Sequence, residues 1–212
     1  RQTIDCINEN KDILLGTKVR LGPTGTTHVN AIDALKKARE IADNTGTLVM
    51  VHVMESDIPL SNVFQYLNPG DIITHCFHGD THNVLDEDQN IRTEVWTAYR
   101  NGIVFDTGCF AKHFSIPICR TAIRNGMPPH TLSTDRIGED HPVEIKYSLL
   151  DVMSMFLEIG MSLEEVIQSV TSRPASVIGR ADLGTLKPGA EGDAVAVSYT
   201  HLRAHEPLRY LV

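Results

Sequence analysis

Short apolar runs alternate along the chain with longer segments in which apolar residues recur at helical spacing. The short runs are rich in β-branched residues, which is typical of buried parallel strands. They lie at 13–19, 47–53, 71–76, 102–105 and 131–133. The longer segments predict helices at 31–43, 91–101, 115–125, 144–157 and 162–170, the last opened by a capping box. The pattern is β-α repeated, which indicates an α/β fold.

The spacing of these strands favours a barrel. They begin about 29 residues apart on average, and a (β/α)8 barrel of about 250 residues repeats roughly every 31. No G-x-G-x-x-G or G-x-x-x-x-G-K-[ST] motif occurs, so a nucleotide-binding open sheet is the weaker interpretation. Because fewer strands are predicted than a closed barrel needs, we expect a partial TIM barrel of about strands 4 to 8.

The two ends of the chain suggest further boundaries. The chain starts without Met and enters a strand within about a dozen residues, so we expect earlier βα units to be missing. Residues 1–182 would form the partial barrel, and 192–197 reads as a strand. Residues 198–212 are basic and have no hydrophobic pattern, so we expect a non-native tail and exclude its histidines from the functional argument.

Composition argues against several classes of partner and of structural site. With 19 Lys+Arg against 27 Asp+Glu the net charge is −8, which argues against a nucleic-acid or anionic-membrane surface. The 4 cysteines form no C-x-x-C pair, so neither a disulfide framework nor a thiolate zinc site is indicated. No apolar run approaches the roughly 18 residues of a membrane span. We therefore expect a cytoplasmic protein.

Side chains able to bind a metal stand at or near the C-terminal ends of four predicted strands. They are Lys18, His52, His75 and Asp135. These ends converge on the face of a barrel where active sites form, and imidazole and carboxylate groups are common zinc ligands. A neutral lysine amine can add carbon dioxide to give an anionic carbamate. Taken singly, each residue also has an ordinary role in a hydrogen bond, a turn or a solvated charge, so the pattern alone leaves both a metal site and these ordinary roles open.

Several motifs resemble the deacetylase branch of the amidohydrolase superfamily, which is related to the dihydroorotases. The most specific is PGDIITHCFHG at 69–79. Weaker pieces are GTKVR at 16–20, VHV at 51–53, STD at 133–135 and LGTLKPGAEGD at 183–193. The resemblance implies a metal-dependent hydrolase that cleaves a small amide, a cyclic amide or an acetyl ester. It also implies that residues 183–197 return to a small β-domain.

The resemblance assigns roles to the four candidate ligands. Lys18, carrying a carbamate derived from CO2, would bridge two divalent ions, and His52 and His75 would bind one of them. Asp135 would bind the other ion and transfer a proton during hydrolysis. Zinc is the expected metal, two per full-length chain, with manganese, cobalt and iron as alternatives.

The sequence departs from the family in two places. No His-x-His pair occurs, although the family carries one on its first barrel strand, so we expect the chain alone to bind metal poorly and to be inactive. Gly108-Cys109-Phe110 stands where relatives have G-H-G. Arg20, His78 and His113 are candidate substrate-binding residues, although Arg20 could instead pair with an acid and the two histidines could be structural.

Three hypotheses stay open. The first is a piece of a two-metal hydrolase with a small-molecule substrate, without nucleic-acid or membrane partners, and with homo-oligomerisation undecided. The second is a non-catalytic barrel fragment or binding module with structural histidines. The third is a one-metal hydrolase in which Lys18 is an ordinary cation.

Overall fold

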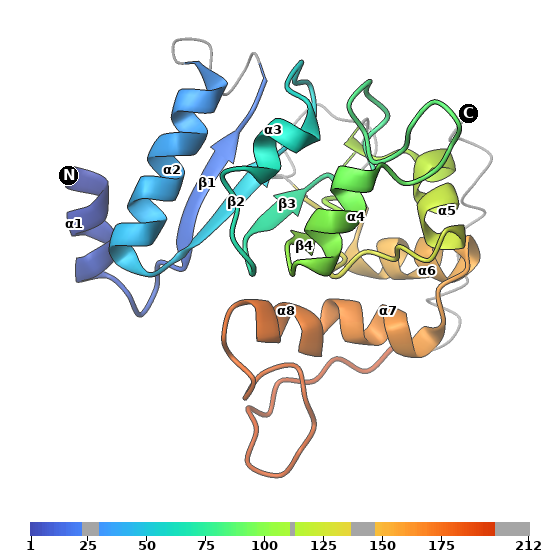
Figure 1. Cartoon of the computed structure of the whole chain (residues 1–212). Coiled ribbons are helices and arrows are strands. Elements are labelled where there is room, and N and C mark those ends of the chain that lie inside the picture. Colours follow the sequence, from blue (N-terminus) through green and yellow to red (C-terminus); the bar gives the residue numbers. More distant parts are fainter. Residues whose placement is uncertain (23–29, 111–112, 137–146, 198–212) are drawn as a thin grey trace. The chain divides into compact units, whose positions relative to one another are not determined.

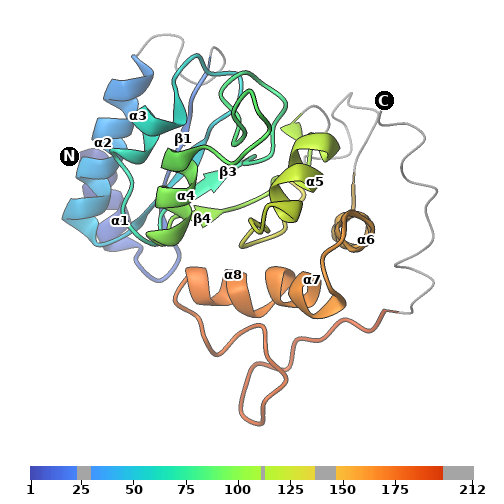
Figure 2. The ribbon, with the colours of Figure 1, turned by 45° about the vertical axis from the view of Figure 1, so that its right-hand side comes forward.

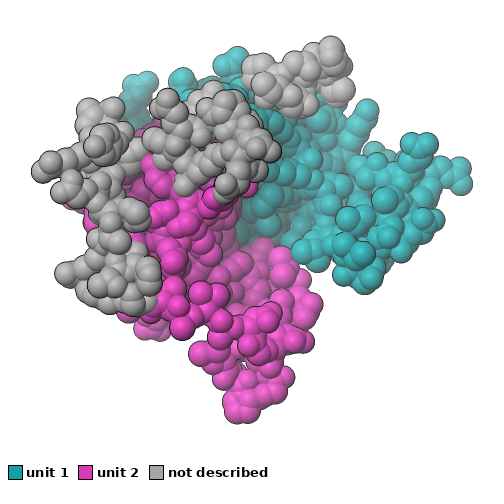
Figure 3. Space-filling model, turned by 180° about the vertical axis from the view of Figure 1, so that it is seen from behind, with its two compact units in different colours: residues 1–76, 80–105 teal, residues 77–79, 106–212 magenta. Residues whose placement is uncertain are grey.

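The computed structural model describes residues 1–22, 30–110, 113–136 and 147–197 of the 212-residue chain. The chain divides into two compact units, which Figure 3 colours separately. Unit 1 contains residues 1–76 and 80–105, and unit 2 contains residues 77–79 and 106–212. The helices and strands of both units are labelled in Figure 1.

Unit 1 is built on a four-stranded parallel sheet whose strands lie side by side in chain order. They are β1 (Gly16–Arg20), β2 (Leu48–His52), β3 (Ile72–Thr74) and β4 (Val104–Phe105). Each overlaps one of the apolar runs, which confirms that those four runs contain strands. The strands are shorter than the runs. Val53 and Cys76, at the ends of two runs, are buried but lie outside the ladder, whereas Ile13, at the start of the first run, is 71% exposed.

Helices cover one face of this sheet, as the ribbon in Figures 1 and 2 shows. The helices of unit 1 are α1 (Gln2–Glu9), α2 (Ala31–Thr45), α3 (Leu60–Phe64) and α4 (Thr93–Arg100). The Phe105 ring contacts Phe64 of α3 and Tyr99 of α4, with ring centroids 6.2 and 5.4 Å away. The face that carries Phe105 is therefore the helix-covered face. Of these helices, α2 and α4 were predicted from the sequence, while α1 and α3 were not.

The longest helix shows how the local sequence sets its limits. At the start of α2 the Asn30 side chain accepts a hydrogen bond from the Ile32 N–H, and at its end Gly46 adopts φ 69°. A left-handed residue is the usual helix terminator, and glycine adopts this conformation without a Cβ clash. Leu35, Ala38 and Ala42 recur at helical spacing and are buried, so this stripe faces β1 and β2.

A buried carboxylate joins the N-terminal ends of β2 and β3 to α2. The Asp71 side chain accepts hydrogen bonds from the backbone N–H groups of Val49 and Asn68, both at 2.7 Å. It also forms an ion pair with Arg39 of α2 at 2.5 Å. Because Asp71 is only 2% exposed, these three donors offset the loss of its hydration.

Unit 2 is helical in its described part. Its helices are α5 (Ile116–Arg124), α6 (Leu149–Ile159), α7 (Leu163–Val170) and α8 (Ser172–Val177). The rings of Phe114 and Phe156 lie 5.7 Å apart, and Phe156 is fully buried. The predicted capping box is present, because Ser162 and Glu165 exchange hydrogen bonds at the start of α7. The helix predicted at 144–157 corresponds to α6, and its first three residues lie outside the described part of the chain.

Two predicted strands of the C-terminal half are not formed as strands. At 131–133 the structure has a single parallel bridge, between Asp106 and Thr131. Residues 192–197 are exposed and are assigned to no strand. The small β-domain therefore stays a prediction, and the tail at 198–212 lies outside the described residues. Among the described residues no helix is long and apolar enough to cross a membrane.

Candidate active site

Two buried histidines meet at the C-terminal ends of β2 and β3. His52 is the last residue of β2, His75 directly follows β3, and each is 1% exposed. Their ring centroids lie 4.4 Å apart with an interplanar angle of 71°. Two of the four predicted ligands are therefore in direct contact within unit 1.

The backbone of His75 accounts for this contact. His52 pairs in register with Thr74, so simple strand alternation would turn the next side chain, His75, to the helix-covered face. His75 instead has φ 62°, in the left-handed region that side-chain-bearing residues rarely adopt. This conformation ends the strand and allows the ring to lie against His52.

The two cationic candidates lie on β1. Lys18 is exposed and pairs in register with Met50, two residues before His52, so Lys18 and His52 share a face of the sheet. Arg20 forms an ion pair with Glu55 at 3.2 Å. Of the two roles considered for Arg20, the structure therefore shows the pairing with an acid.

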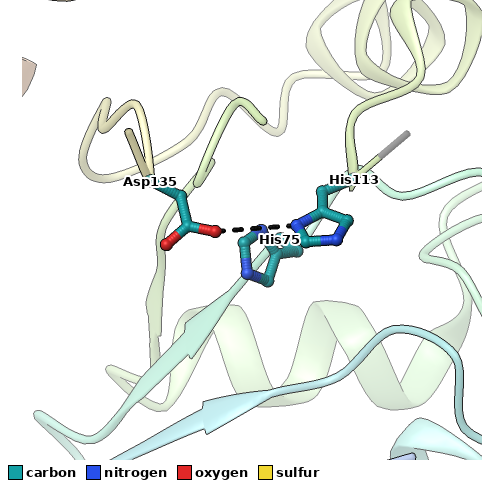
Figure 4. Close-up of side chains that lie close together, drawn as sticks. All are labelled: His75, His113 and Asp135. Carbon is teal, nitrogen blue, oxygen red and sulfur yellow. Dashed lines mark ion pairs between the residues drawn. The ribbon is translucent and has the colours of Figure 1, made fainter. Parts of the chain in front are cut away.

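Unit 2 holds the predicted proton-transfer residue. Asp135 Oδ2 lies 3.6 Å from His113 Nδ1, and Figure 4 draws this ion pair together with His75 of unit 1. The His113 side chain is 7% exposed and that of Asp135 is 35% exposed, so solvent reaches the carboxylate more readily than the ring. Asp135 has φ 48°, which makes it the second proposed ligand with a left-handed backbone. His78, also in unit 2, is 1% exposed.

A polar network that the sequence reasoning missed lies next to Asp135. The Asp106 carboxylate accepts hydrogen bonds from the hydroxyls of Thr131 and Ser133, both at 2.7 Å. The Ser133 N–H donates to the Thr107 hydroxyl at 2.9 Å, and its hydroxyl accepts from the Gly108 N–H at 3.0 Å. A signal was present, because Asp106 directly follows the predicted strand at 102–105, and polar residues at strand ends had already singled out His52 and His75.

These side-chain bonds explain why 131–133 is not a regular strand. In a parallel ladder, backbone N–H and C=O groups pair with each other. Here the Thr107 and Ser133 hydroxyls take part in several of the links between 106–109 and 131–133, and the Cys109 N–H reaches the Ser133 carbonyl at 2.8 Å. The segment therefore follows its neighbour without forming a continuous backbone ladder.

Comparison with known proteins places the chain in a family. The sequence profile of the amidohydrolase family matches residues 73–210. The chain belongs to the amidohydrolase family. A deacetylase of Enterococcus faecalis is 33% identical over 192 residues, covering 88% of this chain and 51% of that protein. A deacetylase of Agrobacterium fabrum is 32% identical over 188 residues, covering 85% of this chain and 45% of its own length.

Solved structures agree with this amidohydrolase assignment. A crystal structure of an adenine deaminase matches with a TM-score of 0.81 and 30% identity, covering 90% of this chain and 52% of that one. A dihydroorotase structure matches with a TM-score of 0.71 and 33% identity, covering 84% and 48%. The chain spans about half the length of the curated relatives it matches.

The amidohydrolase neighbours imply a TIM-barrel-type α/β fold, which agrees with the parallel sheet of unit 1. The resemblance seen in the motifs is thus confirmed at the level of the family. The assignment of the sheet to about strands 4 to 8 of a barrel stays a prediction.

Proposed function

We propose that this chain carries part of the metal centre of an amidohydrolase, and that the full-length protein hydrolyses a small amide, a cyclic amide or an acetyl ester. The observation that carries the proposal is the buried contact between His52 and His75 at adjacent strand ends. The deacetylase and dihydroorotase relatives support hydrolysis of C–N or ester bonds.

The chemistry of the donor set fits a catalytic divalent ion. Imidazole nitrogens and carboxylate oxygens are the usual ligands of zinc, and they also accept manganese, cobalt and iron. His75, His113 and Asp135 each offer one atom that could hold a metal. Our proposed set adds His52, and Lys18 as a carbamate derived from CO2.

Backbone strain at His75 and Asp135 supports their proposed functional role. A left-handed backbone at a residue with a side chain costs on the order of 1 kcal/mol or more, and such residues cluster at functional sites. His75 and Asp135 both adopt it, with φ 62° and 48°. Among the described residues only two other non-glycine residues, Glu55 and Gln89, share this conformation, so half of such residues belong to the proposed set.

Each residue has a distinct role in the proposed reaction. Bound divalent ions would supply Lewis-acid activation of a water molecule and of the substrate carbonyl. His52 and His75 would hold one ion, and the Lys18 carbamate and the Asp135 carboxylate would help to hold the second. Asp135 accepts a proton from the attacking water and donates it to the leaving nitrogen or oxygen. His113, 3.6 Å from Asp135, orients that carboxylate.

The exposure of Lys18 favours keeping a one-metal hydrolase as the second candidate. An exposed ammonium group stays solvated, and in that case Lys18 would be an ordinary surface cation. The Lys18→Ala variant of the full-length enzyme separates the two. Restoration of its activity by short-chain carboxylic acids supports the carbamate, whereas an unchanged activity of the variant supports the one-metal reaction.

The test of the proposal is metal content and chelator sensitivity of the full-length protein. We expect about two divalent ions per chain, loss of activity with chelator, and recovery with zinc or manganese. His75→Asn should lower activity by at least about 100-fold and reduce the metal content. His82→Asn, which alters a half-buried histidine outside the proposed set, is the matched control and should retain both.

A wild-type full-length protein without metal and indifferent to chelator would refute the proposal. That outcome would favour a binding module with structural histidines. The 212-residue chain provides a second comparison, because it lacks a His-x-His pair. We expect it to bind less metal than the full-length protein and to be inactive.

A further inference from the structure

We propose that Asp106 is a positioning residue for Asp135 and acts through Ser133. This inference rests on the proposed role of Asp135 in proton transfer, and it adds a residue pair that holds the catalytic carboxylate in place. Asp106, Ser133 and Asp135 all belong to unit 2.

The Asp106 carboxylate uses both of its oxygens on the segment that leads to Asp135. Oδ1 accepts from the Thr131 hydroxyl and Oδ2 accepts from the Ser133 hydroxyl, each at 2.7 Å. Asp106 is 6% exposed, and a buried carboxylate is stable only when donors replace its lost hydration. The two hydroxyl protons are therefore directed at Asp106, which fixes the rotamers of both side chains.

Ser133 is held at each of its polar groups. Besides donating to Asp106, its hydroxyl accepts from the Gly108 N–H at 3.0 Å, and its N–H donates to Thr107 at 2.9 Å. Its carbonyl accepts from the Cys109 N–H at 2.8 Å. The Ser133 hydroxyl can accept from Gly108 in this geometry because its own proton is directed at Asp106.

The path from Ser133 to the carboxylate is short. Asp135 lies two residues after Ser133, and between them the Thr134 hydroxyl accepts from the Arg136 N–H at 3.2 Å, which closes a local turn. Asp135 itself has a left-handed backbone, which persists only where surrounding contacts determine it. Ser133 is anchored two residues before Asp135, and the local turn encloses Asp135 itself. Together they direct the Asp135 carboxylate toward His113.

Thr131 provides the control for this path. Its hydroxyl binds the other oxygen of Asp106, but Thr131 lies four residues before Asp135 and is itself the bridge partner of Asp106. Removing it disturbs the burial of Asp106 without removing the anchor at Ser133. A positioning role predicts different consequences for Thr131 and Ser133, whereas a purely structural role of Asp106 predicts similar ones.

The experiment measures kcat and KM of the full-length enzyme for five single variants. Asp106→Asn and Ser133→Ala should each lower kcat by about 10-fold or more with KM changed by less than about 3-fold. Ser133→Thr keeps the hydroxyl and should stay within about 3-fold of wild type, as should Thr131→Val despite a lower melting temperature. The fifth variant, Asp135→Asn, should lose nearly all activity.

A double variant tests the path itself. In the Asp135→Asn background, Asp106→Asn should cause no further loss of residual activity, because its effect passes through Asp135. A merely structural role would lower activity in both backgrounds. In the metal-free protein, Asp106→Asn should also accelerate hydrogen exchange at the amides of Gly108 and Ser133, a readout that does not depend on turnover.

The outcomes separate this inference from the proposed function. Full activity of Asp135→Asn would overturn the proposed proton-transfer role and the inference together. Loss of activity in Asp135→Asn with unchanged kcat in Asp106→Asn and Ser133→Ala would overturn the inference alone. If Asp106→Asn does not fold, the difference between Ser133→Ala and Ser133→Thr decides, and equal kcat values in those two would overturn the inference.

Discussion

Replacing Asp71 by Asn should lower the free energy of unfolding of unit 1 more than a substitution on its exposed surface does. The substitution keeps the shape of the side chain but replaces one oxygen by an NH2 group and removes the charge. In the native protein the two oxygens serve three donors, the N–H groups of Val49 and Asn68 and the guanidinium of Arg39. An asparagine cannot accept from all three.

The size of the expected loss in unfolding free energy depends on how well water can replace each of the three hydrogen bonds to Asp71. Asn68 is exposed, so its N–H can turn to solvent at little cost. Val49 is fully buried and the Arg39 side chain is 16% exposed, so whichever of them meets the amide NH2 loses its acceptor. A buried unsatisfied donor costs about 1–3 kcal/mol, and a lost bond to a charged group about 1.5–3 kcal/mol. We expect a loss of about 3 kcal/mol, reduced by the second ion pair of Arg39 with Asp43.

Urea unfolding, monitored by circular dichroism, measures this loss of unfolding free energy. With a slope of about 2 kcal/mol/M, the midpoint of Asp71→Asn should fall by about 1.5 M. Asp43→Asn is the matched control, because its side chain is 57% exposed and an exposed ion pair contributes about 0–1 kcal/mol. A midpoint for Asp71→Asn no lower than that of Asp43→Asn would refute the role given to the buried carboxylate.

Three further predictions follow from local features. Ser162→Ala removes the hydroxyl that accepts from the Glu165 N–H and should lower the free energy of unfolding by about 1 kcal/mol, measured by urea denaturation. Cys6 is exposed whereas the other three cysteines are buried, so Ellman's reagent should label one thiol quickly in the native protein, and several fast thiols would contradict the structure. Burial, with Arg173 nearby, lowers the pKa of His130 below its usual 6.5. The unfolded state is then protonated first as pH falls below 6.5, so stability should decline there, and less steeply in His130→Gln.

The sequence predicted the sheet of unit 1 well because hydrophobic burial dominates there. The apolar runs at 47–53 and 71–76 contain Val49, Val51 and Ile73, which are all fully buried. The alternation that buries them also places Lys18 and His52 on a common face. Polar residues at strand ends could therefore be recognised as a set.

What the sequence could not predict depends on contacts distant along the chain or on special backbone conformations. Periodicity alone does not reveal that Arg20 meets Glu55, 35 residues away, or that Asp106 binds Ser133, 27 residues away. The left-handed backbone at His75 reverses the direction that alternation gives its side chain. The segment at 131–133 has the residues of a strand, but its hydroxyl groups form the links that a backbone ladder would otherwise make.

The left-handed backbones of His75 and Asp135 also have a consequence for engineering. Glycine adopts this conformation without steric cost, and asparagine adopts it more readily than most residues, so either would relax the chain at these two positions. A library selected only for resistance to heat should accumulate such substitutions there and lose the proposed chemistry as its melting temperature rises. Stabilisation of this protein by directed evolution therefore needs a parallel screen for turnover, or these two codons held fixed.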